Sequence, residues 1–300
     1  MDTPSTTPVQ TGLFGTDEPV AAPAVPAPRP SGGWCRPGES GRPIVLSFGG
    51  GVQTTALCAA VLRGLLPRPE RVVMADTGRE GTPTWEYLRT VTAPALAEVG
   101  LEVEVAGHDL ATVDLFSTKG APLMPLYTRA EAGADGEPGQ LGNFCSGEWK
   151  RRVVRRHLRE RGYGPESRGL RPVEMWMGMS LDEAGRFRTA DAGWITTAWP
   201  LAIGLGWDRA RCVREVEALG WPPPPKSSCV MCPYRSDAHH LETKTHHPED
   251  WALALATEAE VRAVDPDAYV HRSGVPLSEV DLDPSASTAE LPCTSGFCFV

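Results

Sequence analysis

Apolar residues fall into five short runs that alternate with longer segments of helical periodicity. The runs predict β-strands, at Pro43–Phe48, Arg71–Ala75, Leu101–Ala106, Val173–Met179 and Trp194–Trp199. Helical patterns lie between them, at Thr54–Leu65, Thr84–Val99 and Gly147–Arg161. Strands that alternate with helices favour parallel βαβ units. The pattern therefore predicts an α/β protein with a doubly wound, parallel, five-stranded sheet.

Beyond the fifth predicted strand the pattern changes. A helix is predicted over Asp208–Leu219, prolines fill Pro222–Pro225, and another helix is predicted over Pro248–Val264. This change predicts that residues 41–206 form the α/β domain. Residues 207–300 are then expected to form a small C-terminal lobe that contains cysteines.

The remaining segments are polar or of low complexity. Residues 1–40 are rich in Pro, Ala, Thr and Gly, a composition that buries too little apolar surface to fold, and we expect a disordered tail. The Gly-rich stretch Arg129–Gly142 is expected to be a mobile loop over the site. No apolar run approaches the roughly 20 residues that span a bilayer, and no secretory signal is present. These features predict a cytoplasmic protein without a membrane partner.

The formal net charge of −9 means that any attraction to nucleic acid must be local. Seven cations do lie within twelve residues of one predicted helix: Lys150, Arg151, Arg152, Arg155, Arg156, Arg159 and Arg161. Such a run is either a solvated helix face or a surface for a polyanion such as tRNA or DNA. The residues alone leave both interpretations open.

A Gly-rich loop follows the first predicted strand and opens the first predicted helix. Its sequence is Ser47-Phe48-Gly49-Gly50-Gly51-Val52-Gln53-Thr54. Backbone N–H groups at such a place can hold an anion, and Thr54 adds a hydroxyl donor. The loop is neither a Walker A sequence nor the dinucleotide Gly-x-Gly-x-x-Gly pattern. Alone, it is equally consistent with a tight turn that binds nothing.

Two further segments follow predicted strands at the edge where parallel sheets bind ligands. Asp76-Thr77-Gly78 ends the second strand, and Gly178–Arg186 ends the fourth. Together with the loop they resemble the PP-loop (adenine nucleotide alpha hydrolase) superfamily, and PAPS reductases in particular. The usual family loop is Ser-Gly-Gly-x-Asp-Ser, with Gln53 here in the place of the Asp. The resemblance is closest to phage-type and DNA-sulfur-modification-type members.

The resemblance implies a HUP-type fold that binds ATP, with Mg²⁺, and splits it between the α and β phosphates to adenylate a substrate. The residues implied in binding ATP are Ser47, Phe48, Gly49, Gly50, Gly51, Val52, Gln53, Thr54, Asp76, Thr77 and Gly178. Arg186 is expected to stabilise negative charge on phosphate, and Lys150 to reach ATP or the adenylated intermediate. Gln53 removes a carboxylate and leaves the handling of Mg²⁺ and pyrophosphate open.

Cysteine spacing adds a second kind of chemistry. Cys229 and Cys232 form a CxxC, and Cys145 lies just before a predicted helix. The spacing supports zinc, an iron–sulfur cluster or a redox pair. The resemblance implies that these three cysteines hold a 4Fe–4S cluster. We favour Cys298 as the fourth ligand, with Cys293 as its substitute or as a mobile thiol that attacks or carries sulfur.

Other candidate ligands are less favoured. Cys58 and Cys212 fall in apolar or amphipathic helices and are expected to be buried, whereas Cys35 falls in the tail. His239 and His240, or His246 and His247, could complete a zinc site with the CxxC, but their polar segment indicates a solvated surface.

These observations predict an ATP-dependent sulfurtransferase that thiolates a nucleic-acid base or a small molecule and takes sulfur from a separate donor. One alternative is a PAPS or nucleotide-sulfate reductase. Another is a non-catalytic nucleic-acid-binding subunit of a DNA modification or defence system. The oligomeric state is open, with a homodimer as one option.

Overall fold

A five-stranded parallel sheet forms the centre of the computed structural model, which describes residues 33–107, 114–129 and 138–285. The strands lie in the order β3-β2-β1-β6-β7. Their bounds are Ile44–Phe48 (β1), Arg71–Ala75 (β2), Val103–Ala106 (β3), Val173–Met177 (β6) and Ile195–Ala198 (β7). All five strands were predicted, and the parallel α/β class is confirmed. The connections run in opposite directions from β1 and β6, so a ligand crevice is expected where these two strands end.

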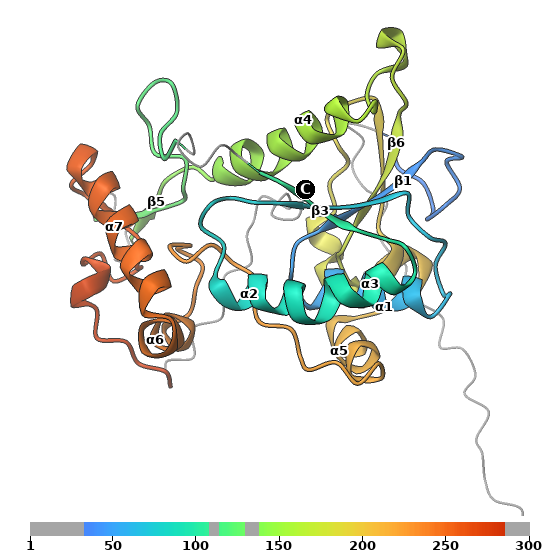
Figure 1. The fold of residues 1–300 in the computed structure, drawn as a ribbon. Coiled ribbons are helices and arrows are strands. Elements are labelled where there is room, and N and C mark those ends of the chain that lie inside the picture. The colour runs from blue at the N-terminus through green and yellow to red at the C-terminus, as the bar shows by residue number, and fades with distance from the viewer. Residues whose placement is uncertain (1–32, 108–113, 130–137, 286–300) are drawn as a thin grey trace, which may run out of the picture.

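Helices cover both faces of the sheet, as the doubly wound prediction requires (Figure 1). One face carries α1 (Val52–Leu62), α2 (Thr82–Tyr87), a π-helical turn (Leu88–Thr92), α3 (Ala93–Glu98) and α5 (Arg209–Glu217). The other face carries α4 (Arg152–Glu160), which continues a π-helical segment at Ser146–Arg151. Alternate strand residues supply the two cores: Leu46 packs with α1 and Val45 with α4. No helix in the described ranges combines the length and apolar character needed to cross a bilayer.

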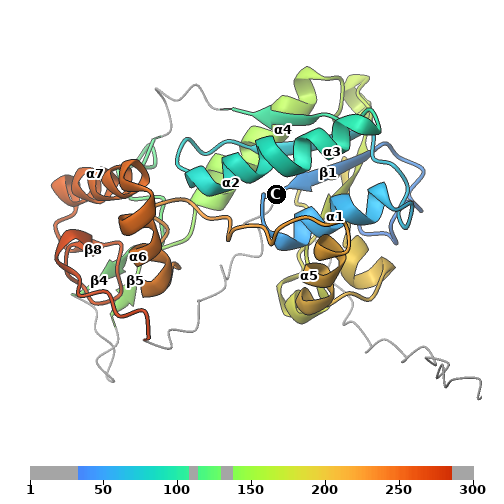
Figure 2. The ribbon, with the colours of Figure 1, turned by 60° about the horizontal axis from the view of Figure 1, so that its bottom comes forward.

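A smaller lobe stands beside the sheet domain (Figure 2). It contains α6 (Asp237–His246), α7 (Pro248–Val264) and an antiparallel sheet of β5 (Gly139–Gln140), β4 (Tyr127–Thr128) and β8 (Ala268–Tyr269). Helix α7 has the predicted bounds, whereas α6 and the small sheet were not predicted. Because β4 and β5 precede α4 in the chain, the lobe also uses residues from the middle of the sequence.

The domain limits differ from those expected at two places. Helix α5 packs on α1, where Cys212 and Val216 join the core of the sheet domain, so the lobe begins after α5 rather than at residue 207. At the other end, ordered structure precedes residue 41, because Trp34 pairs with Thr197 of β7.

The segment before β1 is anchored by Glu174, which is fully buried in β6. Its carboxylate accepts hydrogen bonds from the Gly38 N–H at 2.6 Å and from the Ser40 hydroxyl at 2.6 Å. Cys35 lies in this anchored segment, and burial together with the Glu174 carboxylate raises the pKa of its thiol to about 12. The expectation that Cys35 belongs to a disordered tail is therefore wrong.

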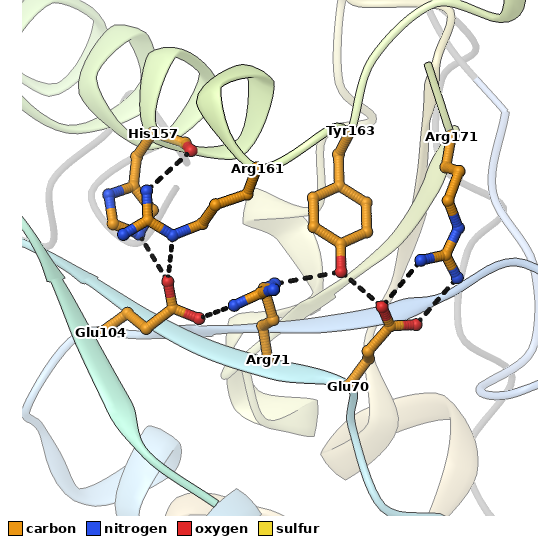
Figure 3. A network of polar contacts seen from close by, with 7 residues as sticks. All are labelled: Glu70, Arg71, Glu104, His157, Arg161, Tyr163 and Arg171. Atoms are coloured by element: carbon orange, nitrogen blue, oxygen red, sulfur yellow. Dashed lines mark hydrogen bonds and ion pairs between the residues drawn. The ribbon is translucent and has the colours of Figure 1, made fainter. Parts of the chain in front are cut away.

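A network of charged groups fixes helix α4 to the edge of the sheet (Figure 3). Glu104 of β3 accepts hydrogen bonds from Arg71 and from Arg161, and its Oε2 atom lies 2.9 Å from Nε2 of His157. Nearby, Tyr163 donates to Glu70, which Arg171 binds through both of its terminal nitrogens at 2.9 and 3.0 Å. This attachment positions α4 and, through it, the preceding π-helical segment, which carries Lys150 and follows Cys145.

Candidate functional site

One cavity of about 300 Å³ opens at the ends of β1 and β6. Its volume is at the lower end of the range of small-molecule sites, roughly 300–1,000 Å³. Of the residues that the sequence indicated, the cavity is lined by Gly51, Val52, Gln53, Cys145, Lys150, Arg186, Cys229 and Cys232. The fold thus brings the phosphate loop, the basic residues Lys150 and Arg186, and three cysteines to a single place.

The Gly-rich loop is shaped by its glycines. Gly50 has φ of +75°, and a Cβ atom there would lie 2.4 Å from Cγ2 of Thr84, so only glycine fits. The Thr54 hydroxyl donates to the Gly51 carbonyl at 3.0 Å and accepts from the Gly49 N–H at 3.3 Å. Thr54 therefore holds the loop in shape, and its hydroxyl is directed into the loop.

Other predicted loop residues lie behind the cavity. A Cβ atom on Gly178 would lie 2.4 Å from Cγ2 of Thr54, so glycine lets the end of β6 pass the first turn of α1. Ser47 and Phe48 are each 3% exposed within β1. These residues position the loop without lining the cavity.

The loop after β2 reaches the cysteines. Asp76 Oδ1 accepts from the Gly78 N–H at 2.7 Å, which closes a local turn. Thr77 is fully buried, and its hydroxyl lies 3.3 Å from the Sγ atom of Cys229. The Asp76-Thr77-Gly78 segment, which the sequence predicts to bind the nucleotide, therefore contacts the CxxC.

Two further contacts join the cysteine segment to the nucleotide side. Glu80 and Cys229 form an antiparallel backbone bridge. The Ser227 hydroxyl contacts the Gly49 carbonyl and lies 2.7 Å from Oε1 of Glu80. The phosphate loop, the loop after β2 and the CxxC are thus one connected unit.

The cysteine thiols are held in a poorly solvated place. Burial raises the pKa of Cys229 to about 12 and that of Cys145 to about 11, and the nearby Lys150 ammonium offsets this only in part. Burial also disfavours the Lys150 ammonium, but the Glu80 carboxylate, together with the three cysteines when they are ionised, outweighs it and raises the pKa of Lys150. The thiols are therefore neutral until a metal or cluster displaces their protons.

Three thiols on one cavity suit an iron–sulfur cluster in their donor chemistry, and thiolates also bind zinc. Within the described residues, no group of three or more His, Cys, Asp and Glu side chains is arranged to hold a metal ion. Cys293 and Cys298 lie outside the described residues. Cys58 and Cys212 are fully buried in the apolar core, as predicted.

A hydrogen-bonded row of polar side chains lies beside the phosphate loop. Gln53 donates through Nε2 to Oε2 of Glu183 at 2.9 Å, and Arg186 pairs with the other oxygen of Glu183. Arg209, the first residue of α5, donates to Oε1 of Gln53 at 3.3 Å. The cavity lining therefore includes four cations, Lys150, Arg186, Arg209 and Lys226, and one carboxylate, that of Glu183. Sequence reasoning named neither Arg209 nor Lys226.

The basic helix is largely ion-paired. Arg151 and Arg155 contact Asp191, Arg152 contacts Glu148, and Arg161 contacts Glu104. The guanidinium of Arg159 lies over the ring of Trp194. Of the two interpretations of this run, these contacts favour the solvated helix face, with four of its arginines ion-paired. Lys150 differs from the rest because it lines the cavity.

His240 does not lie on a solvated surface as expected, whereas His246 is exposed as expected. His240 is 1% exposed on α6, where its ring packs edge-on against Trp251 and His271. Burial and the nearby Arg235 lower its pKa to about 3. His240 is therefore a neutral residue of the lobe's interior.

Comparisons with known proteins give little similarity. No protein-family model matches the chain, and no curated protein matches it. Among solved structures, one match is U34-tRNA thiolase NcsA from Methanococcus maripaludis, described with its 4Fe-4S cluster. It is 12% identical at a TM-score of 0.39, over 73% of this chain and 71% of the thiolase. Similarity at this level does not assign a function.

Proposed function

We propose that the protein is an ATP-dependent sulfurtransferase that adenylates its acceptor before sulfur replaces the activated oxygen. The observation that carries the proposal is the shared cavity, in which the phosphate loop and three cysteines meet. Four lining cations against one carboxylate make this cavity suitable for a polyanion, although the whole chain has a net charge of −9.

The binding of ATP would use the phosphate loop and the cations. The triphosphate would lie against the start of α1 near Gly51 and Val52, with Arg186 nearby. The acceptor oxygen attacks the α phosphorus, and pyrophosphate leaves. Arg186 stabilises the negative charge that develops on the phosphate oxygens.

Sulfur transfer would take place at the cysteine side of the same cavity. A hydrosulfide attacks the activated carbon. AMP leaves with the former oxygen of the acceptor, and the acceptor carbon becomes a thiocarbonyl. Lys150 lies among Cys145, Cys229 and Cys232 and balances their negative charge or that of the α-phosphate. Asp76 keeps the Thr77 loop closed against this site.

We also propose that Cys145, Cys229 and Cys232 hold a 4Fe–4S cluster, with Cys298 as the fourth ligand and Cys293 as its substitute or as a sulfur carrier. When bound by Cys145, Cys229 and Cys232 alone, the cluster would leave one iron as a place for sulfide, and ligation of that iron by Cys298 would close this place. Anaerobically purified protein is expected to be brown, with about four irons per chain for such a cluster, and Cys229→Ala should lose the colour. Colourless protein with stoichiometric zinc would contradict this assignment.

The acceptor is expected to be a nucleic-acid base, in tRNA or DNA, or a small molecule. Purified protein should convert ATP to AMP and pyrophosphate when hydrosulfide and cell-derived RNA, DNA or metabolites are supplied. Mass spectrometry of nucleosides and small thiometabolites from cells with and without the protein should show an oxygen-to-sulfur exchange. Reduction of PAPS by thiols without ATP cleavage would instead support the reductase. Nucleotide binding without turnover, together with salt-sensitive DNA or RNA binding, would support the non-catalytic subunit.

A further inference from the structure

The cavity offers poor ligands for a divalent metal ion on its phosphate side. Mg²⁺ is bound in proteins by carboxylates, waters and substrate phosphates. Glu183 is the one carboxylate in the described lining, and its two oxygens are occupied by Gln53 and Arg186. The described lining of the cavity therefore does not fit a protein-held Mg²⁺.

Guanidinium groups occupy this place instead. Arg209 reaches from the start of α5 to Gln53, which is 5% exposed and fixed by its second hydrogen bond to Glu183. Gln53 thus joins two oppositely charged groups in the row Arg209, Gln53, Glu183 and Arg186. A carboxylate in place of the Gln53 amide would lie against Glu183 and would need a cation between the two.

The Arg209 side chain can exchange its partner. Arg209 is exposed, and its 3.3 Å hydrogen bond to Gln53 is long and ends on a neutral amide oxygen. A phosphate oxygen is a stronger acceptor for a guanidinium because the bond is charge-assisted. The backbone N–H of Arg209 separately donates to Asp182 at 3.0 Å, so the start of α5 does not depend on this side chain.

We propose that Arg209 is a phosphate-binding residue and that, with Arg186, it supplies the charge compensation for which nucleotide sites commonly use a divalent metal ion. The ligand class is a nucleoside triphosphate, bound without Mg²⁺. This inference rests on the proposed use of ATP. It concerns the binding of the triphosphate.

Isothermal titration of the full chain with α,β-methylene-ATP, a non-hydrolysable analogue, tests the proposal in buffer with EDTA and in buffer with Mg²⁺. The dissociation constants in the two buffers should agree within about threefold, because binding does not depend on Mg²⁺. The loss of one charge-assisted contact would already change a dissociation constant about tenfold. Arg209→Gln should weaken binding by about tenfold in both buffers. Arg211→Gln is the matched control, since Arg211 lies on the same helix, pairs with Glu215 and does not line the cavity.

A second variant should make binding depend on Mg²⁺. Gln53→Glu places a carboxylate beside Glu183, so binding should be lost in EDTA and regained with Mg²⁺. Circular dichroism checks that each variant is folded. Binding of the analogue by the unmodified protein only with Mg²⁺, or unchanged affinity in Arg209→Gln, would overturn the inference and leave the proposed function intact. No binding in either buffer would overturn both.

Discussion

The hydroxyl of Thr77 lies 3.3 Å from the Sγ atom of Cys229, although the two residues are 152 positions apart. The contact joins the loop after β2, where Thr77 is fully buried, to the CxxC at the cavity wall. A hydroxyl that donates to sulfur favours the thiolate, and this contact lowers the pKa of Cys229 against the larger opposing effect of burial.

Replacing Thr77 with valine should weaken the cysteine site while keeping the volume of the side chain. The expected result is a lower iron content of anaerobically purified protein, because the Cys229 thiolate loses its hydrogen bond. Iron per chain and visible absorbance measure the effect. Thr55→Val is the control, since Thr55 is fully buried in α1 and its hydroxyl has no hydrogen-bond partner among the described residues. Equal iron in the two variants would contradict the role of Thr77.

Alanine substitutions at the neighbouring Gly50 and Gly51 test whether the loop is held in its observed conformation. Gly50→Ala should destabilise the protein by about 1–3 kcal/mol, because of the positive φ and the contact with Thr84. Gly51→Ala should cost less than about 1 kcal/mol, since its Cβ would lie 3.8 Å from Ser227. Urea unfolding measures both free energies. A Gly50 variant as stable as the Gly51 variant would show that the loop is not held in this conformation.

Asp250 connects the two parts of the molecule. From α7 it accepts hydrogen bonds from the Thr82 N–H and the Thr82 hydroxyl, both at 2.8 Å, and so caps α2 from another domain. Asp250→Ala should lower the free energy of unfolding by about 1–2 kcal/mol, as for other lost caps. Glu249→Ala, at an exposed neighbour, should change it by less than half of that. Similar values for the two variants would exclude the cap as a source of stability.

The Glu104 network should make stability depend on pH in the acid range. Burial alone would raise the pKa of Glu104, but hydrogen bonds from Arg71, His157 and Arg161 outweigh it and lower this pKa. A lowered pKa stabilises the fold above the ordinary glutamate value of about 4.3, and the contribution is lost as the pH falls through the lowered value.

Glu104→Gln should therefore cost about 1–3 kcal/mol at pH 7 and approach the unmodified protein in acid. Urea unfolding from pH 7 to pH 3 measures the difference. The exposed neighbour Glu102→Gln serves as the control. A constant difference between Glu104→Gln and the unmodified protein at all pH values would exclude an electrostatic origin.

The inner strands of the central sheet, β1, β2 and β6, were predictable because each is a short apolar run buried between helices, whereas the edge strand β3 includes Glu104 and the exposed Val105. The same reasoning misses the small sheet, since strands of two residues, such as Tyr127–Thr128, have no periodicity. Helix α6 was missed because its sequence is polar, and His240 is buried by packing against α7 and His271 rather than by any local pattern.

The site was predictable only where a local motif marks it. The phosphate loop and the CxxC are such motifs, and the structure places both at one cavity. Arg209 has no such mark: it lies 156 positions from Gln53, and the packing of α5 on α1 brings them together. The direction of the Thr54 hydroxyl depends on a rotamer that the sequence does not reveal.

The backbone bridge between Glu80 and Cys229 has a consequence for how the protein can change. Main-chain atoms alone make such a pairing, so its register does not depend on the side chains beside it. Met231 and Tyr234 line the cavity beside this bridge but are not part of it. A different side chain at either position would change the cavity wall near the cysteines without removing the main-chain link between the CxxC and the loop after β2.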